Sequence, residues 1–163
     1  AATILNDVGP ELDAAGLDRI KTYVGKGARF DNWAEAAAAV AANHEHLPAA
    51  FTAADWEVVA RRMCREDGEE IVFDYDQAIA RPFKTRGPAP DVDLWPLFRT
   101  LAERPLLVLR GERSDLLGTD AMARMEAISP HVTAATIPGV GHAPSLDEPE
   151  AVAAIDAFLG RLD

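Results

Sequence analysis

Residues 105–111 read Pro-Leu-Leu-Val-Leu-Arg-Gly, with an unbroken apolar run at 106–109. An apolar run this short, bounded by proline and glycine, indicates a β-strand that is covered on both faces. Strands of that kind occur in parallel sheets with helices packed against them. This stretch therefore predicts a fold of the α/β class.

Segments on either side of this run extend the pattern. Residues 3–5 and 134–137 are short and apolar or β-branched, which predicts two further strands. Residues 119–128 and 149–162 begin with a threonine and a proline, which are typical of helix starts, and predict two helices. Because strands and helices alternate, we expect a parallel sheet joined by right-handed crossovers.

The middle of the chain has a different character. Ten of the eleven aromatic residues lie between Tyr23 and Phe98, and helices are predicted over 34–42 and 53–65. The stretch 86–90 reads Arg-Gly-Pro-Ala-Pro, which a helix cannot cross, and we expect a module boundary there, followed by a short helix over 93–102. We therefore expect a core and a largely helical insertion, with the core formed by residues 1–24 and 101–163 and the insertion by residues 25–100.

Composition and charge exclude several classes of function. The net charge of −11 and the presence of only three lysines argue against a nucleic-acid-binding protein. Cys64 is the only cysteine, so no internal disulfide or cysteine-based metal site is expected, and we interpret it as a packed thiol. No apolar run approaches the roughly 20 residues that span a bilayer. We expect a soluble, cytoplasmic protein that does not bind membranes.

Two loops that follow predicted strands carry residues suited to proton transfer. Asp115 follows the strand at 106–109, and His142 lies in the loop Pro-Gly-Val-Gly-His-Ala-Pro at 138–144. The carboxyl ends of parallel strands share one edge of the sheet, and neighbouring strands lie only about 4.8 Å apart. A carboxylate on one ring nitrogen fixes the tautomer of an imidazole and stabilises its cation. We therefore expect an Asp115–His142 pair.

Two other residues could supply the carboxylate. Glu112 lies in the same loop as Asp115, and Asp7 follows the end of another predicted strand. Asp7 is the principal alternative, although a turn or capping role before the Gly-Pro pair at 9–10 is the preferred explanation for it.

Other polar residues are given structural explanations. His44 and His46 stand two positions apart, so on a helix their side chains point in nearly opposite directions and do not form a metal site. Asp74 and Asp76 are interpreted as solvated strand or turn residues. His131 is expected at the surface.

Three stretches together resemble the α/β-hydrolase family: Leu-Asn-Asp-Val-Gly-Pro at 5–10, the run at 105–111 leading to Ser114 and Asp115, and the histidine loop followed by Asp-Glu-Pro at 147–149. The resemblance implies that His142 is the catalytic base and Asp115 the catalytic acid, in a triad ordered nucleophile, acid, histidine. It also implies that residues 25–100 form a helical lid over the acyl or alkyl part of a small-molecule substrate. No metal or organic cofactor is implied.

The chain departs from that family in one respect. It contains no Gly-x-Ser-x-Gly, and its three serines, Ser114, Ser129 and Ser145, lie in other contexts. The chain begins Ala-Ala-Thr-Ile-Leu and enters a predicted strand at once, which we interpret as the later part of a longer protein, or else as a mature terminus after removal of a leader.

By resemblance, the nucleophile and the oxyanion loop belong to an N-terminal half of the same enzyme, which is the expected partner of this chain. We expect the intact protein to cleave an ester, lactone, thioester or carbon–carbon bond, and this chain alone to be inactive. Two alternatives stay open: a non-catalytic binding protein on a truncated hydrolase scaffold, and one piece of a split enzyme.

Overall fold

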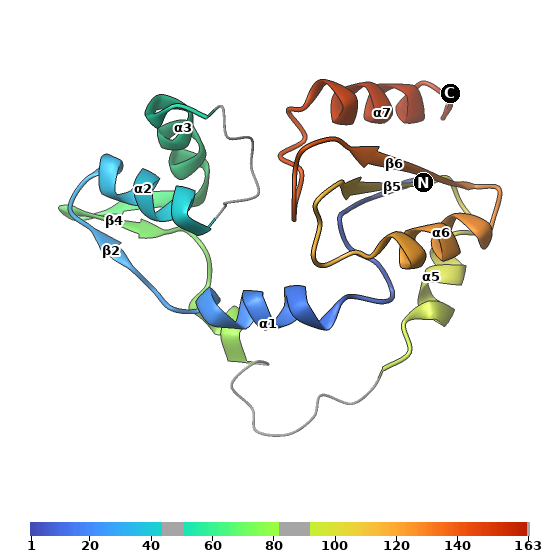
Figure 1. Cartoon of the computed structure of the whole chain (residues 1–163), viewed down its shortest axis with the longest axis horizontal. Coiled ribbons are helices and arrows are strands. Elements are labelled where there is room, and N and C mark those ends of the chain that lie inside the picture. The colour runs from blue at the N-terminus through green and yellow to red at the C-terminus, as the bar shows by residue number, and fades with distance from the viewer. Residues whose placement is uncertain (44–50, 82–91, 163) are drawn as a thin grey trace. The chain divides into compact units, whose positions relative to one another are not determined.

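The computed structural model describes residues 1–43, 51–81 and 92–162 (Figure 1). The chain divides into two compact units. Unit 1 comprises residues 1–19 and 88–163, and unit 2 comprises residues 20–87. The boundary between them falls within helix α1 (Ala14–Tyr23).

Unit 1 is built on a parallel sheet with the strand order β1-β5-β6. All six residues of the central strand β5 are buried, as expected for a strand covered on both faces. Pairing of Asn6 with Leu109 and of Leu109 with Ala135 brings the carboxyl ends of the three strands to one edge. The strands are β1 (Thr3–Asn6), β5 (Leu106–Gly111) and β6 (Val132–Ile137).

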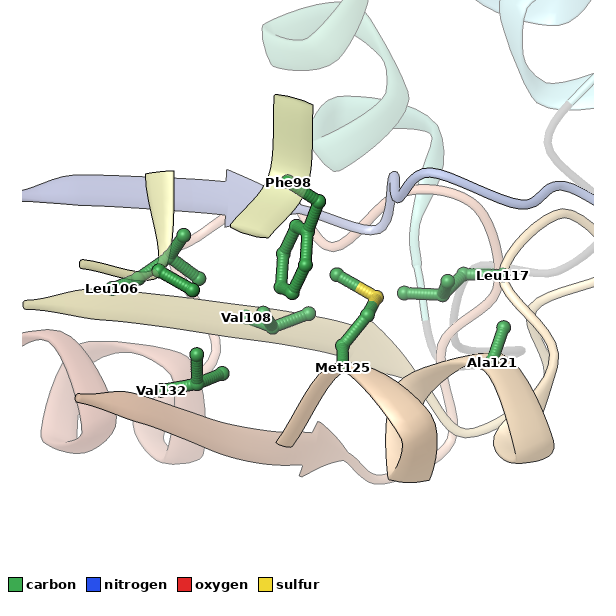
Figure 2. Packing of buried hydrophobic residues seen from close by; sticks show 8 residues of the cluster. Phe98, Leu106, Val108, Leu117, Ala121, Met125 and Val132 are labelled. Atoms are coloured by element: carbon green, nitrogen blue, oxygen red, sulfur yellow. The ribbon is translucent and has the colours of Figure 1, made fainter. Parts of the chain in front are cut away.

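Helices pack on both faces of this sheet, with α7 on one side and α5 and α6 on the other (Figure 1). Figure 2 shows Phe98 of α5 and Met125 of α6 converging on Val108 of the central strand. Phe98 is 3% exposed and Met125 and Val108 are fully buried, so these contacts form the main hydrophobic core of unit 1. The helices are α5 (Trp95–Leu101), α6 (Thr119–Ala127) and α7 (Pro149–Leu159).

Helix α5 lies within the range 25–100 that we predicted as the insertion, but it belongs to unit 1. The helix belongs to unit 1 because Phe98 and the adjacent Ala102 are buried in the cluster that contains Leu106 and Val108. The aromatic residues at this end of the range thus serve the core of the parallel sheet.

Helices make up most of the regular secondary structure of unit 2, as expected, but its strands were not predicted. It contains a three-stranded antiparallel sheet with the order β2-β4-β3, beside the helices that the sequence predicted. The elements are β2 (Arg29–Phe30), α2 (Trp33–Asn43), α3 (Ala53–Met63), β3 (Cys64–Asp67), β4 (Glu70–Phe73) and the 3-10 helix η1 (Gln77–Ala80).

The two longer helices of unit 2 are capped by side chains at their N-termini. Asn32 Oδ1 accepts the backbone N–H of Glu35, and Thr52 forms a reciprocal capping box with Asp55. Helix α3 ends at Met63 rather than at residue 65, because Cys64 already pairs with Phe73 in the antiparallel sheet. Strand β3 was missed because three of its four residues are charged, which removes the apolar pattern.

Candidate active site

His142 lies in the loop that follows β6, at the shared carboxyl edge of the parallel sheet. Two hydrogen bonds, at Gly139 and Val140, hold this loop against the loop after β5. Gly139 has a φ of +71°, which glycine adopts without strain, and its N–H donates to Glu112 Oε2 at 2.7 Å. Val140 is 1% exposed, and its carbonyl accepts the N–H of Arg113 at 2.8 Å. The backbone on the approach to His142 is therefore fixed by the loop after β5.

The partner of the imidazole is Asp7, at the end of β1. His142 Nδ1 lies 2.8 Å from Asp7 Oδ2, and the other carboxylate oxygen accepts the N–H of Gly111 at 3.0 Å. Asp7 has no solvent exposure, whereas 20% of the His142 side chain is exposed. A buried carboxylate thus holds a ring that keeps access to solvent.

Asp7 occupies an unusual backbone conformation. Its φ of +56° places it in the left-handed region, which aspartate and asparagine tolerate better than most residues. Its own N–H donates to the carbonyl of Leu109 at 2.8 Å, so the turn stays attached to β5. This conformation redirects the chain at the strand end and holds the carboxylate under the imidazole.

His142 follows β6 and Asp7 follows β1, and β5 lies between these two strands. The pair forms because Gly111, at the end of β5, has no side chain. A Cβ at Gly111 would overlap the carbonyls of Val140 and Gly141. The histidine loop therefore crosses directly over the end of β5 to reach Asp7.

Asn6, the residue before Asp7, secures the far side of the histidine loop. Its Nδ2 donates to the carbonyl of Pro144 at 2.9 Å. Its Oδ1 is buried and accepts no hydrogen bond from the residues that the structure describes. Sequence reasoning missed this role, since only the structure shows that the Asn6 side chain reaches the loop.

The structure does not bring Asp115 to His142, in contrast to the expected pair. Both Asp115 oxygens accept from Arg19 of α1, with Nε to Oδ2 at 2.6 Å and Nη2 to Oδ1 at 2.8 Å. Gly16 of the same helix lies directly against the Asp115 backbone. Glu112, the other acidic residue of that loop, is used to hold Gly139.

The remaining candidates lie away from this pair. Asp76 caps η1, and Asp74 forms an ion pair with Arg65 at 3.3 Å. His131 is exposed, and burial raises the pKa of the Cys64 thiol. His44 and His46 lie outside the described residues. Within the described ranges, no group of three or more acidic, histidine or cysteine side chains is placed to hold a metal ion.

An imidazole held through Nδ1 by a buried carboxylate is suited to proton transfer. An ionised carboxylate only accepts hydrogen bonds, so Nδ1 carries the proton between them. Nε2 is then the nitrogen left to accept a proton from a reacting group. This arrangement has the geometry that an acid and a histidine adopt in catalytic triads.

The model of the alpha/beta hydrolase family matches residues 3–155. The chain belongs to this family. A 3-hydroxybutyrate-oligomer hydrolase of Cupriavidus necator is 34% identical over 167 residues, covering 96% of this chain and 55% of the relative. The chain therefore spans about half the length of the curated relative that it matches.

Solved structures agree with this membership. An alpha/beta hydrolase from Novosphingobium aromaticivorans is 47% identical with a TM-score of 0.88, covering 99% of this chain and 57% of that one. A putative hydrolase from Rickettsia typhi is 27% identical with a TM-score of 0.79, covering 98% and 53%. For the parts of this α/β-hydrolase chain that the structure describes, no helix is long and apolar enough to cross a membrane.

Proposed function

We propose that this chain supplies the acid–base pair of an ester-cleaving hydrolase, with His142 as the general base and Asp7 as the acid that orients it. The observation that carries the proposal is the 2.8 Å contact between His142 Nδ1 and the fully buried Asp7 carboxylate. Asp7 thus replaces Asp115 as the proposed acid. Asp115 is proposed to anchor α1 through Arg19.

In this mechanism a nucleophile hydroxyl gives its proton to His142 Nε2 as it attacks the ester carbonyl. The imidazolium then gives the same proton to the departing alkoxide, and a water repeats the sequence on the acyl-enzyme. Asp7 stays ionised throughout and stabilises the imidazolium. Its burial strengthens this interaction because little water screens it.

The nucleophile and the oxyanion donors are proposed to come from polypeptide outside these 163 residues, the N-terminal half of the same enzyme. Support comes from β1, which is the terminal strand of the parallel sheet in the part of the chain that the structure describes. Ile4 and Val8, in and just after this strand, are each 37% exposed. A further strand pairing with β1 would cover such residues.

The proposed substrate class is a short hydroxyacyl ester. The support is the 34% identity to a 3-hydroxybutyrate-oligomer hydrolase, whose name describes an enzyme that acts on such oligomers. Unit 2 is proposed to serve as the lid over the acyl part of the substrate. The same proton-transfer chemistry also suits lactone, thioester and carbon–carbon bond cleavage.

The decisive experiment is covalent labelling of the longer polypeptide by a fluorophosphonate probe, with hydrolysis of a 3-hydroxybutyrate dimer measured in parallel. We expect both to occur and both to be lost in His142→Ala. His131→Ala is the matched control, since His131 is exposed and, among the described residues, hydrogen bonds form only to its backbone. The purified 163-residue chain should show neither reaction.

Labelling that persists in His142→Ala would contradict the assignment of the base. An unlabelled and inactive longer polypeptide would instead favour a binding protein that has kept the hydrolase scaffold.

A further inference from the structure

Unit 2 contains a pocket of its own, with a volume of about 460 Å³. This volume lies within the range of roughly 300–1,000 Å³ that is typical of small-molecule sites. Every described residue that lines the pocket belongs to unit 2. The pocket therefore includes neither His142 nor Asp7.

The walls of the pocket are apolar and continuous with the core of unit 2. Phe30 of β2 meets Phe73 of β4 edge-on, with ring centroids 5.7 Å apart, and both pack against the core cluster. Val40 of α2 has no solvent exposure and belongs to that cluster. Met63 and Ile79 complete the apolar lining. Such walls suit an alkyl chain and offer it few hydrogen bonds.

One part of the pocket is polar. The Tyr75 hydroxyl accepts the N–H of Gly25 at 3.2 Å, which places it beside the backbone of Lys26. Among the described residues that line the pocket, Lys26 is the only charged one. The described part of the chain places no carboxylate within ion-pairing distance of its ammonium group. A cation without an acidic partner is notable in a chain whose net charge is −11.

The position of this polar end is set by the backbone. Gly25 has a φ of +68°, and a Cβ at this position would overlap Ala80 of η1. The 25–26 segment therefore lies against η1 only because residue 25 is glycine. The Lys26 side chain starts from this fixed point, and its long apolar stem can lie along the pocket wall while the ammonium stays at the mouth.

We propose that this pocket binds a molecule with an alkyl chain and a terminal carboxylate. The chain lies between Phe30, Phe73 and Val40, and the carboxylate pairs with the Lys26 ammonium group. The hydrogen of the Tyr75 hydroxyl, which has no acceptor among the described residues, is the second donor to the carboxylate.

Octanoate is the probe, and octan-1-ol is the uncharged probe of equal chain length. Calorimetric titration of the purified chain should show saturable octanoate binding and clearly weaker octanol binding. Lys26→Gln should weaken octanoate binding about fivefold, the effect of a partly exposed charge pair, and leave octanol binding unchanged. Lys21→Gln, on α1 and outside the pocket lining, is the matched loss of a cation and should change neither affinity.

A second pair of variants tests the location. Ala39 lines the pocket, whereas the adjacent Ala38 is exposed and does not. Ala39→Phe should abolish binding of both probes and Ala38→Phe should leave it intact, with circular dichroism showing that each variant folds. The proposal would be overturned by equal affinity for octanoate and octanol. It would also be overturned if Lys26→Gln left the affinity for octanoate unchanged, or if Ala39→Phe left the binding of both probes unchanged.

Discussion

The two units handle charge and burial in opposite ways. In unit 1, every residue of β5 is buried, and the polar groups at the end of the sheet are fixed by one another and by backbone groups. In unit 2, β3 reads Cys-Arg-Glu-Asp and has only one buried residue. Arg29 of the same sheet forms exposed ion pairs with Asp67 and Glu70. Site geometry is thus rigidly built in unit 1, while unit 2 owes its order to a smaller core.

The largest expected effect separates the two acids of unit 1. Asp7→Asn should lower kcat of the longer polypeptide roughly 10³–10⁴-fold, because an amide can hold His142 in the wrong tautomer. Asparagine tolerates the positive φ of residue 7, so the fold should survive. Asp115→Asn, which weakens the pairing with Arg19, should lower kcat less than about fivefold.

Hydrolysis of the dimer substrate, with circular dichroism of each variant, checks this pair. A larger loss in Asp115→Asn than in Asp7→Asn would restore Asp115 as the acid.

The cores of the two units bury their methionines to different depths. Met125 is fully buried in unit 1, whereas Met63 in unit 2 is only partly buried and lines the pocket. Met125→Ala should lower the free energy of unfolding by about 2–5 kcal/mol, and Met63→Ala by about 1 kcal/mol. Urea unfolding measures both. Equal losses would show that the two cores are packed equally well.

Each unit also contains a glycine with the same backbone angle. Gly139 and Gly68 both have φ of +71°, and a Cβ would meet nothing within 4 Å at either position. Alanine at each should therefore cost about 1–2 kcal/mol of stability from backbone strain alone. Only Gly139→Ala, in the histidine loop, should also reduce turnover. Loss of activity in Gly68→Ala would contradict the separation of roles between the units.

The smallest effect is expected at the exposed charges of unit 2. Hydrogen bonding to Arg29, followed by the charge of Arg65, lowers the pKa of Asp67. Arg29→Gln should raise the pKa of Asp67 part of the way back, since Arg65 stays in place. Because the pKa of Asp67 is lowered in the folded state, its ionised form stabilises the fold at pH values above the unfolded-state pKa. This contribution to stability is lost as the pH falls through the folded-state pKa. NMR titration of the carboxyl carbon detects the shift, and an unchanged value would show that the ion pair does not form in solution.

Burial explains which features could be predicted from the sequence. The strand at 106–109 and the α/β fold class could be predicted because strands that are buried on both faces are uniformly apolar. Strand β3 could not be predicted from the sequence, since three of its four residues are charged. Helix α5 was assigned to the wrong region because its aromatic residues do not reveal which core they enter.

His142 was identified from its loop, but its partner required the three-dimensional structure. Sequence separation favours Asp115, which lies closer in the chain than Asp7 does. The path of the histidine loop decides otherwise, because this loop crosses Gly111 and ends above Asp7. The positive φ of Asp7 has no strong sequence signal, although the following Gly-Pro indicated a turn.

Arg110 shows how a cation can be buried at this edge without competing for Asp7. It is only 6% exposed, and its guanidinium donates to the carbonyls of Leu117, Glu112 and Ser114. Main-chain carbonyl dipoles therefore stabilise the charge of the guanidinium. In the described part of the chain, Arg110 forms no ion pair with a carboxylate. Among the described residues, the Asp7 carboxylate contacts the imidazole and the Gly111 N–H, and not Arg110. Lysine at 110 would supply the charge but could not span three carbonyls at once.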